Sequence, residues 1–348
     1  MEITKRTALT PAGEITIFTL VNASGASVEL SALGAGILAV NVPDSNGRSA
    51  NVALSYRDPA SYLGDGPCLG KVPGRYANRI ARGHLEIDGK TYQLNINNGP
   101  NALHGGPTGF QNRIWNARET EDGIMFTYRS EDGEENYPGT LDASVRYRWS
   151  DDNTLTLEFS ATADAPTVVN LTNHTYWNLD GADSGTALDH TLLIRADRYI
   201  PTDETLIPTG EKALVSGTPM DFRTFKRVGE EIAADFPALK YGKGYDAGWL
   251  VNGWEEGKMI SGAVILRAAR SGRRLVIDSD QPDAHVYTGN WLDGSPENRE
   301  GRPYRDYEGI AIEMQGVPDA PNQPGFPSQT LRPGETYRRT IRFHLLTD

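Results

Sequence analysis

The fold class is decided by one alternating stretch, Asn153-Thr154-Leu155-Thr156-Leu157-Glu158-Phe159-Ser160, in which every second residue is apolar. Successive side chains of a β-strand point to opposite faces, so this pattern is typical of a strand with one face on a hydrophobic core. The turn signal Asp151-Asp152-Asn153 precedes it. We therefore expect a half-buried strand that begins directly after this turn.

Similar stretches lie on both sides of this segment. His84-Leu85-Glu86-Ile87 and Tyr92-Gln93-Leu94-Asn95-Ile96 flank Asp88-Gly89, a pair that readily supplies the positive φ angles of a tight hairpin turn. Glu121-Asp122-Gly123 marks another turn between alternating runs. Near the C-terminus, Arg332-Pro333-Gly334-Glu335 predicts a turn, and a last strand is expected from Tyr337 to Leu346.

Helical periodicity is scarce. One short helix is expected at about Thr224 to Phe236, where Phe225, Val228, Ile232 and Phe236 would share a face. The Pro-rich stretch Val317 to Pro327 is interpreted as a rigid surface loop, because its prolines cannot serve a central strand. We expect an all-β protein, one large and mainly antiparallel β-sandwich with very few short helices, formed as a single domain over residues 1–348.

The formal net charge of −12 bears on the partners. Nucleic acids and anionic membrane surfaces are bound through Lys and Arg, so we expect neither as a partner. The charge also makes a multiply charged phosphate ester a less natural ligand, although a local basic pocket could override it. A neutral polyol fits best.

Cys68 is the only cysteine, which excludes an intrachain disulfide and a cysteine metal cluster. We interpret it as structural because its segment, Gly66-Pro67-Cys68-Leu69-Gly70, is apolar and does not favour a thiolate. Residues Met1 to Leu20 lack the continuous apolar run of a signal peptide, and no stretch has the length of a transmembrane span. A cytoplasmic protein is expected.

Motifs for cofactors are missing from the sequence. Gly-x-Gly-x-x-Gly after a strand, Gly-Lys-Ser/Thr and His-Glu-x-x-His are absent, as is Gly-x-Ser-x-Gly. The six histidines have no close ligand spacing, although distant residues can converge in space: His84, His104, His174, His190, His285 and His344. We expect neither a cofactor nor a metal.

Three segments carry the residue types of a polyol pocket. They are Gly74-Arg75-Tyr76-Ala77-Asn78-Arg79 with the later Asn101-Ala102-Leu103-His104-Gly105-Gly106, Asn170-Leu171-Thr172-Asn173-His174-Thr175-Tyr176-Trp177-Asn178-Leu179, and Ala311-Ile312-Glu313-Met314-Gln315. Arg, Asn, His and Asp supply hydrogen bonds for vicinal hydroxyls, and an aromatic ring can cover the C–H face of a sugar.

In this order, the segments resemble the galactose mutarotase (aldose 1-epimerase) family. The resemblance continues through Tyr137-Pro138-Gly139, Tyr287-Thr288-Gly289-Asn290 and Pro318-Asp319-Ala320-Pro321-Asn322-Gln323, and it covers the chain from about Ala8 to Leu346. Any one motif would be weak, but their joint order makes the match strong.

The resemblance implies a "supersandwich" β-fold and interconversion of the α and β anomers of free hexoses such as glucose and galactose. It implies His174 as general acid, Glu313 as general base and His104 as an assisting group. The residues implied to line the sugar site are Asn78, Arg79, His104, Tyr176 and Asp246.

This chemistry needs one acid and one base. Mutarotation removes a proton from the anomeric hydroxyl, delivers one to the ring oxygen, and recloses the ring after rotation about C1–C2. A carboxylate and a protonated imidazole on opposite sides of the pyranose can carry out both transfers. Each transfer raises the reaction rate by roughly a hundred- to ten-thousand-fold. We expect Glu313 ionised and His174 charged at neutral pH, each favoured by the other's charge.

Structural alternatives exist for each candidate. A histidine in a Thr/Asn-rich run is more often a hydrogen-bonded structural residue, and a carboxylate in a strand-like run is usually solvated. Asn78 and Arg79 could form a turn and a strand-end ion pair, and Asp246 could cap a loop. For Arg75 and Trp177, the functional and the structural interpretation stay equally open.

The sequence departs from the family at two positions, and two other functions compete with a hexose mutarotase. Where members often have His after the aspartate at Asp246, this chain has Ala247, and where they often have Gln as a sugar contact, it has His285. We expect His285 to bond a hydroxyl in a pH-dependent way. One rival is a hexose-phosphate or pentose epimerase, for which Arg302 and Arg305 are candidate phosphate contacts. The other is a non-catalytic sugar-binding sandwich protein.

Overall fold

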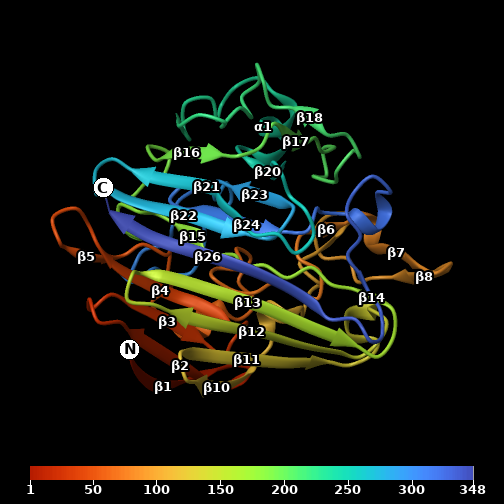
Figure 1. The fold of residues 1–348 in the computed structure, drawn as a ribbon, viewed down its shortest axis with the longest axis horizontal. Coiled ribbons are helices and arrows are strands. Elements are labelled where there is room, and N and C mark those ends of the chain that lie inside the picture. Colours follow the sequence, from red (N-terminus) through yellow and green to blue (C-terminus); the bar gives the residue numbers. More distant parts are fainter. Residues whose placement is uncertain (348) are drawn as a thin grey trace.

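A computed structural model describes residues 1–347 and confirms the all-β fold (Figure 1). The described chain has 26 strands, five short 3-10 helices and one α-helix, α1 (Pro237–Gly242). Three large antiparallel sheets of nine, six and five strands make up most of it. Within residues 1–347, no helix combines the length and apolar character needed to cross a membrane.

The nine-stranded sheet contains the stretch that predicted the fold. Figure 1 shows its long strands running side by side across the molecule. Leu155, Leu157 and Phe159 are buried on one strand near its middle, as their alternation predicts. In spatial order the strands are β10 (Asn116–Thr120), β11 (Gly123–Ser130), β12 (Leu141–Trp149), β13 (Thr154–Ala163), β26 (Tyr337–Thr347), β22 (Arg273–Ser279), β21 (Ile260–Ala268), β16 (Thr191–Ile194) and β19 (Lys226–Arg227).

The two other large sheets pack against the nine-stranded sheet. The five-stranded sheet has the order β1 (Glu2–Thr10), β2 (Gly13–Val21), β3 (Ser27–Ser31), β4 (Gly36–Pro43), β5 (Ser49–Asn51). The six-stranded sheet has the order β15 (Tyr176–Trp177), β24 (Ile310–Gln315), β23 (Asp283–Tyr287), β20 (Asp246–Leu250), β17 (Arg198–Ile200), β18 (Ala213–Leu214).

Aromatic contacts join these layers. Phe18 on β2 meets Phe126 on β11 with ring centroids 6.2 Å apart. Trp177 on β15 meets Phe343 on β26 at 5.1 Å. Both pairs lie in one main hydrophobic cluster that draws on all three sheets. The predicted sandwich is therefore confirmed, since stacked sheets bury their facing apolar sides in this way.

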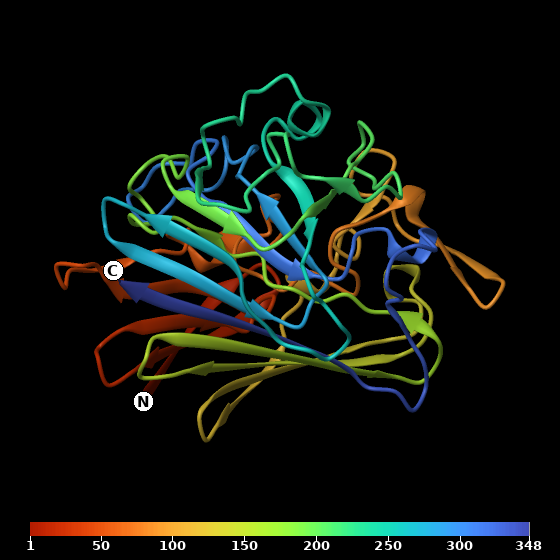
Figure 2. The ribbon, with the colours of Figure 1, turned by 45° about the horizontal axis from the view of Figure 1, so that its top comes forward.

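The remaining elements are short. The predicted hairpin is confirmed as β7 (His84–Ile87) and β8 (Lys90–Gln93), and it projects from the side of the molecule opposite the two termini (Figures 1 and 2). The small strand pairs are β6 (Arg79–Ile80) with β9 (Ala102–Leu103), β7 (His84–Ile87) with β8 (Lys90–Gln93), and β14 (Thr167–Val168) with β25 (Thr330–Leu331). The 3-10 helices are η1 (Pro59–Tyr62), η2 (Ala81–Gly83), η3 (Phe110–Asn112), η4 (Glu134–Asn136) and η5 (Ala320–Asn322).

The helix expected at Thr224 to Phe236 is wrong. Lys226 and Arg227 form β19 on the edge of the nine-stranded sheet, and the next two amides donate to carbonyl oxygens of His190 and Leu188. This sheet pairing satisfies the backbone of the segment and outweighs its helical periodicity. The only α-helix of residues 1–347 begins immediately afterwards, with Pro237 at its first position, where a proline costs no hydrogen bond.

The interpretation of Val317 to Pro327 as a surface loop is only half correct. The segment has no strand and carries η5, but Val317, Ala320 and Phe326 are buried in a small cluster with Ile200. Apolar side chains therefore anchor the loop to the six-stranded sheet.

His190 predicts an acid-sensitive fold. The ring is fully buried and its Nε2 accepts a hydrogen bond from the Leu179 amide at 2.9 Å. Burial lowers the pKa of His190 from 6.5 to about 4. Between these values the unfolded chain binds a proton that the folded chain does not, so the free energy of unfolding falls as pH falls through this window, by about 1.4 kcal/mol per pH unit.

Urea denaturation of the wild type and His190→Gln at about pH 7.5 and pH 5 tests this expectation. Glutamine retains an acceptor for the Leu179 amide but does not titrate. The variant should lose less stability on acidification than the wild type, because other histidines contribute equally to both. An equal loss in the two proteins would contradict the assignment to His190.

Candidate active site

One face of the six-stranded sheet carries polar side chains from four adjacent strands. In the ladder, Tyr176 on β15 lies opposite Ala311 on β24, and Ala311 lies opposite Tyr287 on β23. Tyr287 in turn lies opposite Asp246 on β20. Residues paired directly across a sheet share a face, so strands far apart in sequence place these groups together.

Glu313 lies on the same face, opposite His285. Its neighbours Ile312 and Met314 point to the other face and join the main hydrophobic cluster. The strand alternation thus turns the carboxyl group of Glu313 away from the core. The side chain is nevertheless only 1% exposed, because loops cover this face, so the solvated alternative for Glu313 is wrong.

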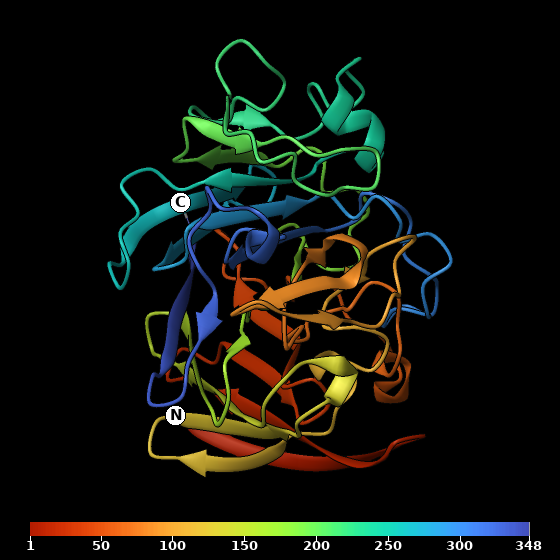
Figure 3. The ribbon, with the colours of Figure 1, turned by 90° about the vertical axis from the view of Figure 1, so that its right-hand side faces the viewer.

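These loops bring the remaining candidates over the sheet. The His174 amide donates to the Lys71 carbonyl oxygen at 2.9 Å, and the Gly70 amide donates to the His174 carbonyl oxygen at 2.9 Å. Asn78 and His104 come from the β6–β9 region, which is orange in Figure 3. Two hydrogen bonds join them: the Asn78 amide donates to Nδ1 of His104 at 3.1 Å, and the His104 amide donates to the Asn78 carbonyl oxygen at 3.1 Å.

All candidate residues implied by the resemblance converge on one pocket of about 620 Å³. That volume lies in the usual range for small-molecule sites. The lining residues are Gly66, Pro67, Asn78, Arg79, Asn98, Gly99, Pro100, Leu103, His104, His174, Tyr176, Glu204, Thr205, Leu206, Tyr241, Asp246, His285, Tyr287, Trp291 and Glu313.

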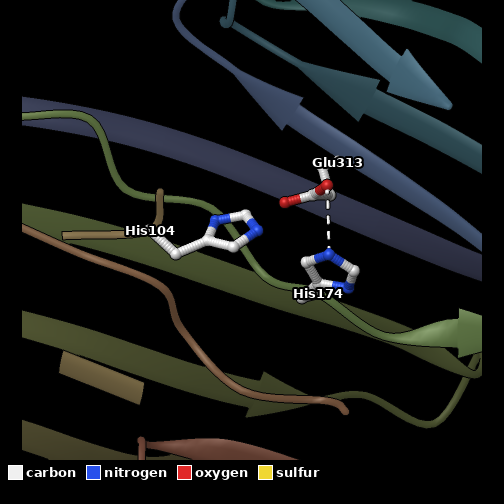
Figure 4. Close-up of side chains that lie close together, drawn as sticks. All are labelled: His104, His174 and Glu313. Atoms are coloured by element: carbon white, nitrogen blue, oxygen red, sulfur yellow. Dashed lines mark ion pairs between the residues drawn. The ribbon is translucent and has the colours of Figure 1, made fainter. Parts of the chain in front are cut away.

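His174 and Glu313 both line this pocket, and their side chains are in contact (Figure 4). Nε2 of His174 lies 3.4 Å from Oε1 of Glu313. Within residues 1–347, Nδ1 of His174 and Oε2 of Glu313 have no hydrogen-bond partner. The ring of His104 stands nearly perpendicular to that of His174, with centroids 5.3 Å apart. The two candidate proton-transfer groups therefore lie side by side in the pocket, not on opposite sides of it.

Burial controls the protonation of this pair. It lowers the pKa of His174 from 6.5 to about 4. Burial, together with the nearby Asp246 carboxylate, raises the pKa of Glu313 well above its usual range. Both shifts favour the neutral forms of His174 and Glu313, which runs against the ion pair expected at neutral pH.

His104 has a fixed tautomer. A backbone amide can only donate, so Nδ1 of His104 accepts from the Asn78 amide and the neutral ring carries its proton on Nε2. Burial, with His174 and Arg79 nearby, lowers the pKa of His104 well below its usual range, which keeps the ring neutral. His104 is therefore a hydrogen-bond donor toward the pocket.

This tautomer bears on metal binding. His104, His174 and Glu313 offer potential ligand atoms within 4.8 Å of one another. A metal would need the lone pair of His104 Nε2, which the neutral tautomer does not have, because Nδ1 is engaged by the Asn78 amide. The donor set thus does not fit a metal.

Asp246 is held between two partners. Its Oδ1 lies 2.7 Å from Nε2 of His285, and its Oδ2 lies 3.5 Å from Nη2 of Arg79. Burial alone would raise the pKa of Asp246, but Arg79 and His285 outweigh it and hold this pKa below its usual range. The carboxylate is therefore ionised and can only accept hydrogen bonds.

Several other candidates prove structural. The Arg75 guanidinium is buried and donates to the carbonyl oxygens of Pro138 and Gly139. Trp177 belongs to the main hydrophobic cluster. Both residues therefore have a structural role. Cys68 is buried, and burial raises the pKa of its thiol, as the structural interpretation predicts. Arg302 pairs with Glu308 at 2.8 Å, and neither it nor Arg305 lines the pocket.

Some lining residues were not predicted. Asn98 accepts a hydrogen bond from Nε of Arg79 at 3.1 Å, and Tyr287 places its ring 6.4 Å from that of His174. Trp291 is 63% exposed at the pocket and its amide donates to the Tyr287 hydroxyl. Tyr287 belongs to Tyr287-Thr288-Gly289-Asn290, a segment that carries the family resemblance, and this was its only sequence signal. Asn98 and Trp291 lie in turn-rich segments that give none.

Comparisons with known proteins agree with this geometry. A sequence model of the family described as Aldose 1-epimerase matches residues 16–344. Galactose mutarotase of Homo sapiens is 42% identical over 316 residues, covering 91% of this chain and 90% of that protein. Aldose 1-epimerase of Escherichia coli K12 is 38% identical over 345 residues, covering 98% of each.

A solved structure is similar over the same length. The aldose epimerase homologue from C. elegans has a TM-score of 0.86 and 31% identity, covering 98% of this chain and 99% of that chain. The family match extends over nearly the whole described fold and includes every strand that carries the pocket. The chain therefore belongs to the aldose 1-epimerase family of isomerases.

Proposed function

We propose that the pocket interconverts the α and β anomers of free aldohexoses of the glucose and galactose class by acid–base ring opening and reclosure. The observation that carries this proposal is the contact of 3.4 Å between His174 Nε2 and Glu313 Oε1, two groups that line a polar, sugar-sized pocket. Names of the relatives point the same way, since they are called galactose mutarotase and aldose 1-epimerase.

The side-by-side arrangement suits the reaction. The anomeric oxygen O1 and the ring oxygen O5 are both bonded to C1, so an acid and a base a few ångströms apart can reach both. Glu313 takes the O1 proton while His174 gives a proton to O5, and the C1–O5 bond breaks to leave the open-chain aldehyde. After rotation about C1–C2, O5 returns its proton to His174 as it attacks C1, and O1 recovers a proton from Glu313.

The neutral forms of Glu313 and His174 are compatible with these roles. A neutral Glu313 with a neutral His174 holds the same number of protons as the corresponding ion pair, and the two states differ by one proton transfer across their contact. Sugar hydroxyls that hydrogen-bond to both groups offset the desolvation that disfavours the charges. Substrate binding therefore prepares the ionised base and the charged acid together.

The rest of the pocket favours a neutral sugar. Asp246 accepts from hydroxyl groups, His104 donates through Nε2, and the Tyr176 ring forms a wall with its centroid 5.0 Å from that of His174. In the part of the chain that the structure describes, Arg79 is the only Lys or Arg lining the pocket, and it is paired with Asp246. A phosphate group would therefore lack a free cationic partner, which disfavours the hexose-phosphate rival.

Polarimetry tests the function directly. Freshly dissolved α-D-glucose and α-D-galactose should reach anomeric equilibrium faster with the wild-type protein than in buffer. Xylose and glucose 6-phosphate, run in parallel, address the pentose and phosphate rivals. A lack of acceleration on every free sugar would overturn the enzyme proposal and favour the sugar-binding rival.

A substitution at His174 tests the acid. His174→Asn keeps a polar side chain but cannot deliver a proton, so kcat for glucose should fall by about 10²- to 10⁴-fold. Polarimetry with the purified variant measures this, and circular dichroism checks its fold. Turnover close to that of the wild type would exclude His174 as the acid and assign that role to His104.

We infer a cytoplasmic location and no nucleic-acid or membrane partner, which the net charge of −12 supports. We also infer a single domain over residues 1–348, supported by a main hydrophobic cluster that runs from Phe18 to Leu345.

A further inference from the structure

The contact between His285 and Asp246 lies beside the acid–base pair but takes no part in the proton transfers proposed above. Both side chains are buried, at 4% and 9% exposure, and both line the pocket. Nε2 of His285 lies 2.7 Å from Oδ1 of Asp246, the distance of a strong charge-assisted hydrogen bond. Because a carboxylate can only accept, Nε2 of His285 carries the proton in this contact.

The imidazole has no nitrogen left for a sugar. Nε2 is engaged by Asp246, and Nδ1 is buried, with no hydrogen-bond partner within residues 1–347. A direct bond from His285 to a sugar hydroxyl would require either giving up the Asp246 contact or exposing Nδ1. The direct sugar contact expected from the family pattern therefore does not match the orientation of this ring.

Asp246, in contrast, is fixed at both oxygens and open to the pocket. His285 holds Oδ1, and the Arg79 guanidinium lies 3.5 Å from Oδ2. Arg79 is itself held by its Nε donating to Asn98 at 3.1 Å. A carboxylate with both oxygens engaged cannot rotate freely, so its remaining lone pairs keep a constant direction toward a ligand.

We infer that His285 is a positioning residue that acts on the sugar through Asp246, which it holds in the orientation that receives a sugar hydroxyl. This inference rests on the proposed function for its substrate. It accounts for a histidine at this position in a chemically simple way: the ring supplies one N–H to a carboxylate and makes no contact with the substrate.

A double-mutant cycle tests the inference. His285→Phe keeps a planar ring but removes the donor, and should raise KM for glucose by about tenfold while kcat stays within about threefold. His285→Gln retains an N–H donor and should keep KM within about threefold of the wild type. Asp246→Asn should raise KM, and adding His285→Phe to it should raise KM by less than about twofold more.

The outcomes are distinct. If His285→Phe raises KM by the same factor in the wild-type and in the Asp246→Asn background, His285 contacts the sugar independently of Asp246. That result would overturn the inference. An unchanged KM in His285→Phe, or a His285→Gln variant as impaired as His285→Phe, would also overturn it. The matched control is His344→Phe, which removes a similar contact of 3.0 Å to Asp278 outside the pocket and should leave KM unchanged.

Failure of the proposed function can be separated from failure of this inference. If the wild type binds glucose without equilibrating its anomers, the proposed function fails. The same four proteins are then compared by the Kd for glucose, measured by calorimetry. His285 acts through Asp246 if His285→Phe weakens binding in the wild type but not in the Asp246→Asn background.

Discussion

Glu313→Gln is expected to lower kcat for glucose by about 10²- to 10⁴-fold, because glutamine cannot take up the O1 proton. The substitution keeps the size of the side chain and an oxygen acceptor near His174. KM should change little, since binding relies on Asp246, Arg79 and His104. The free energy of unfolding should not fall, because the wild-type carboxyl group is 1% exposed and its burial disfavours the charged form.

Polarimetry of both anomers, with urea denaturation of the same samples, measures these two effects. Glu308→Gln is a suitable control because Glu308 is also a buried glutamate, paired with Arg302 outside the pocket. That control should retain most of the activity. If the Glu313→Gln protein equilibrates the anomers at nearly the wild-type rate, Glu313 is excluded as the base, whatever the variant's free energy of unfolding.

Much of the fold could be predicted from the sequence, because local alternation reports directly on burial. Leu155, Leu157 and Phe159 point to one face of β13 for this reason, and Asp88-Gly89 fixes the turn of the β7–β8 hairpin. The same local reasoning failed at Thr224 to Phe236. There the decisive interaction is the pairing of β19 with β16, which no local pattern contains.

The site was predictable only in part. The residues implied by the resemblance do converge on one pocket, but the local context of His174 or Glu313 could not have shown it. The contact between His285 and Asp246 depends on the register of β23 against β20, where Asp246 lies opposite Tyr287. The charge states of His174 and Glu313 depend on how deeply the covering loops bury them. Such tertiary facts are invisible in single-residue patterns.

A buried ion pair supports the wall of the pocket that holds His174. Lys71 and Asp65 have fully buried side chains, and the Lys71 ammonium donates to the Asp65 carboxylate and to the Tyr62 carbonyl oxygen. The other Asp65 oxygen accepts from the Leu69 amide at 2.9 Å. The segment between them contributes Gly66 and Pro67 to the pocket, and the Lys71 carbonyl oxygen accepts from the His174 amide.

Lys71→Met is therefore expected to lower the free energy of unfolding by about 3–5 kcal/mol, because it leaves the Asp65 carboxylate buried without its partner. Lys71→Met combined with Asp65→Asn removes both charges and should recover most of this loss, since an uncharged pair avoids the desolvation cost. Urea denaturation of the wild type, the two single variants and the double variant measures the coupling. The single Lys71→Met variant should also lose activity, as the loop that holds the His174 backbone loosens. If Lys71→Met is as stable as the wild type, or the double variant is no better than the single one, the ion pair does not hold this wall, and the backbone hydrogen bonds of His174 to Lys71 and Gly70 position it without the ion pair.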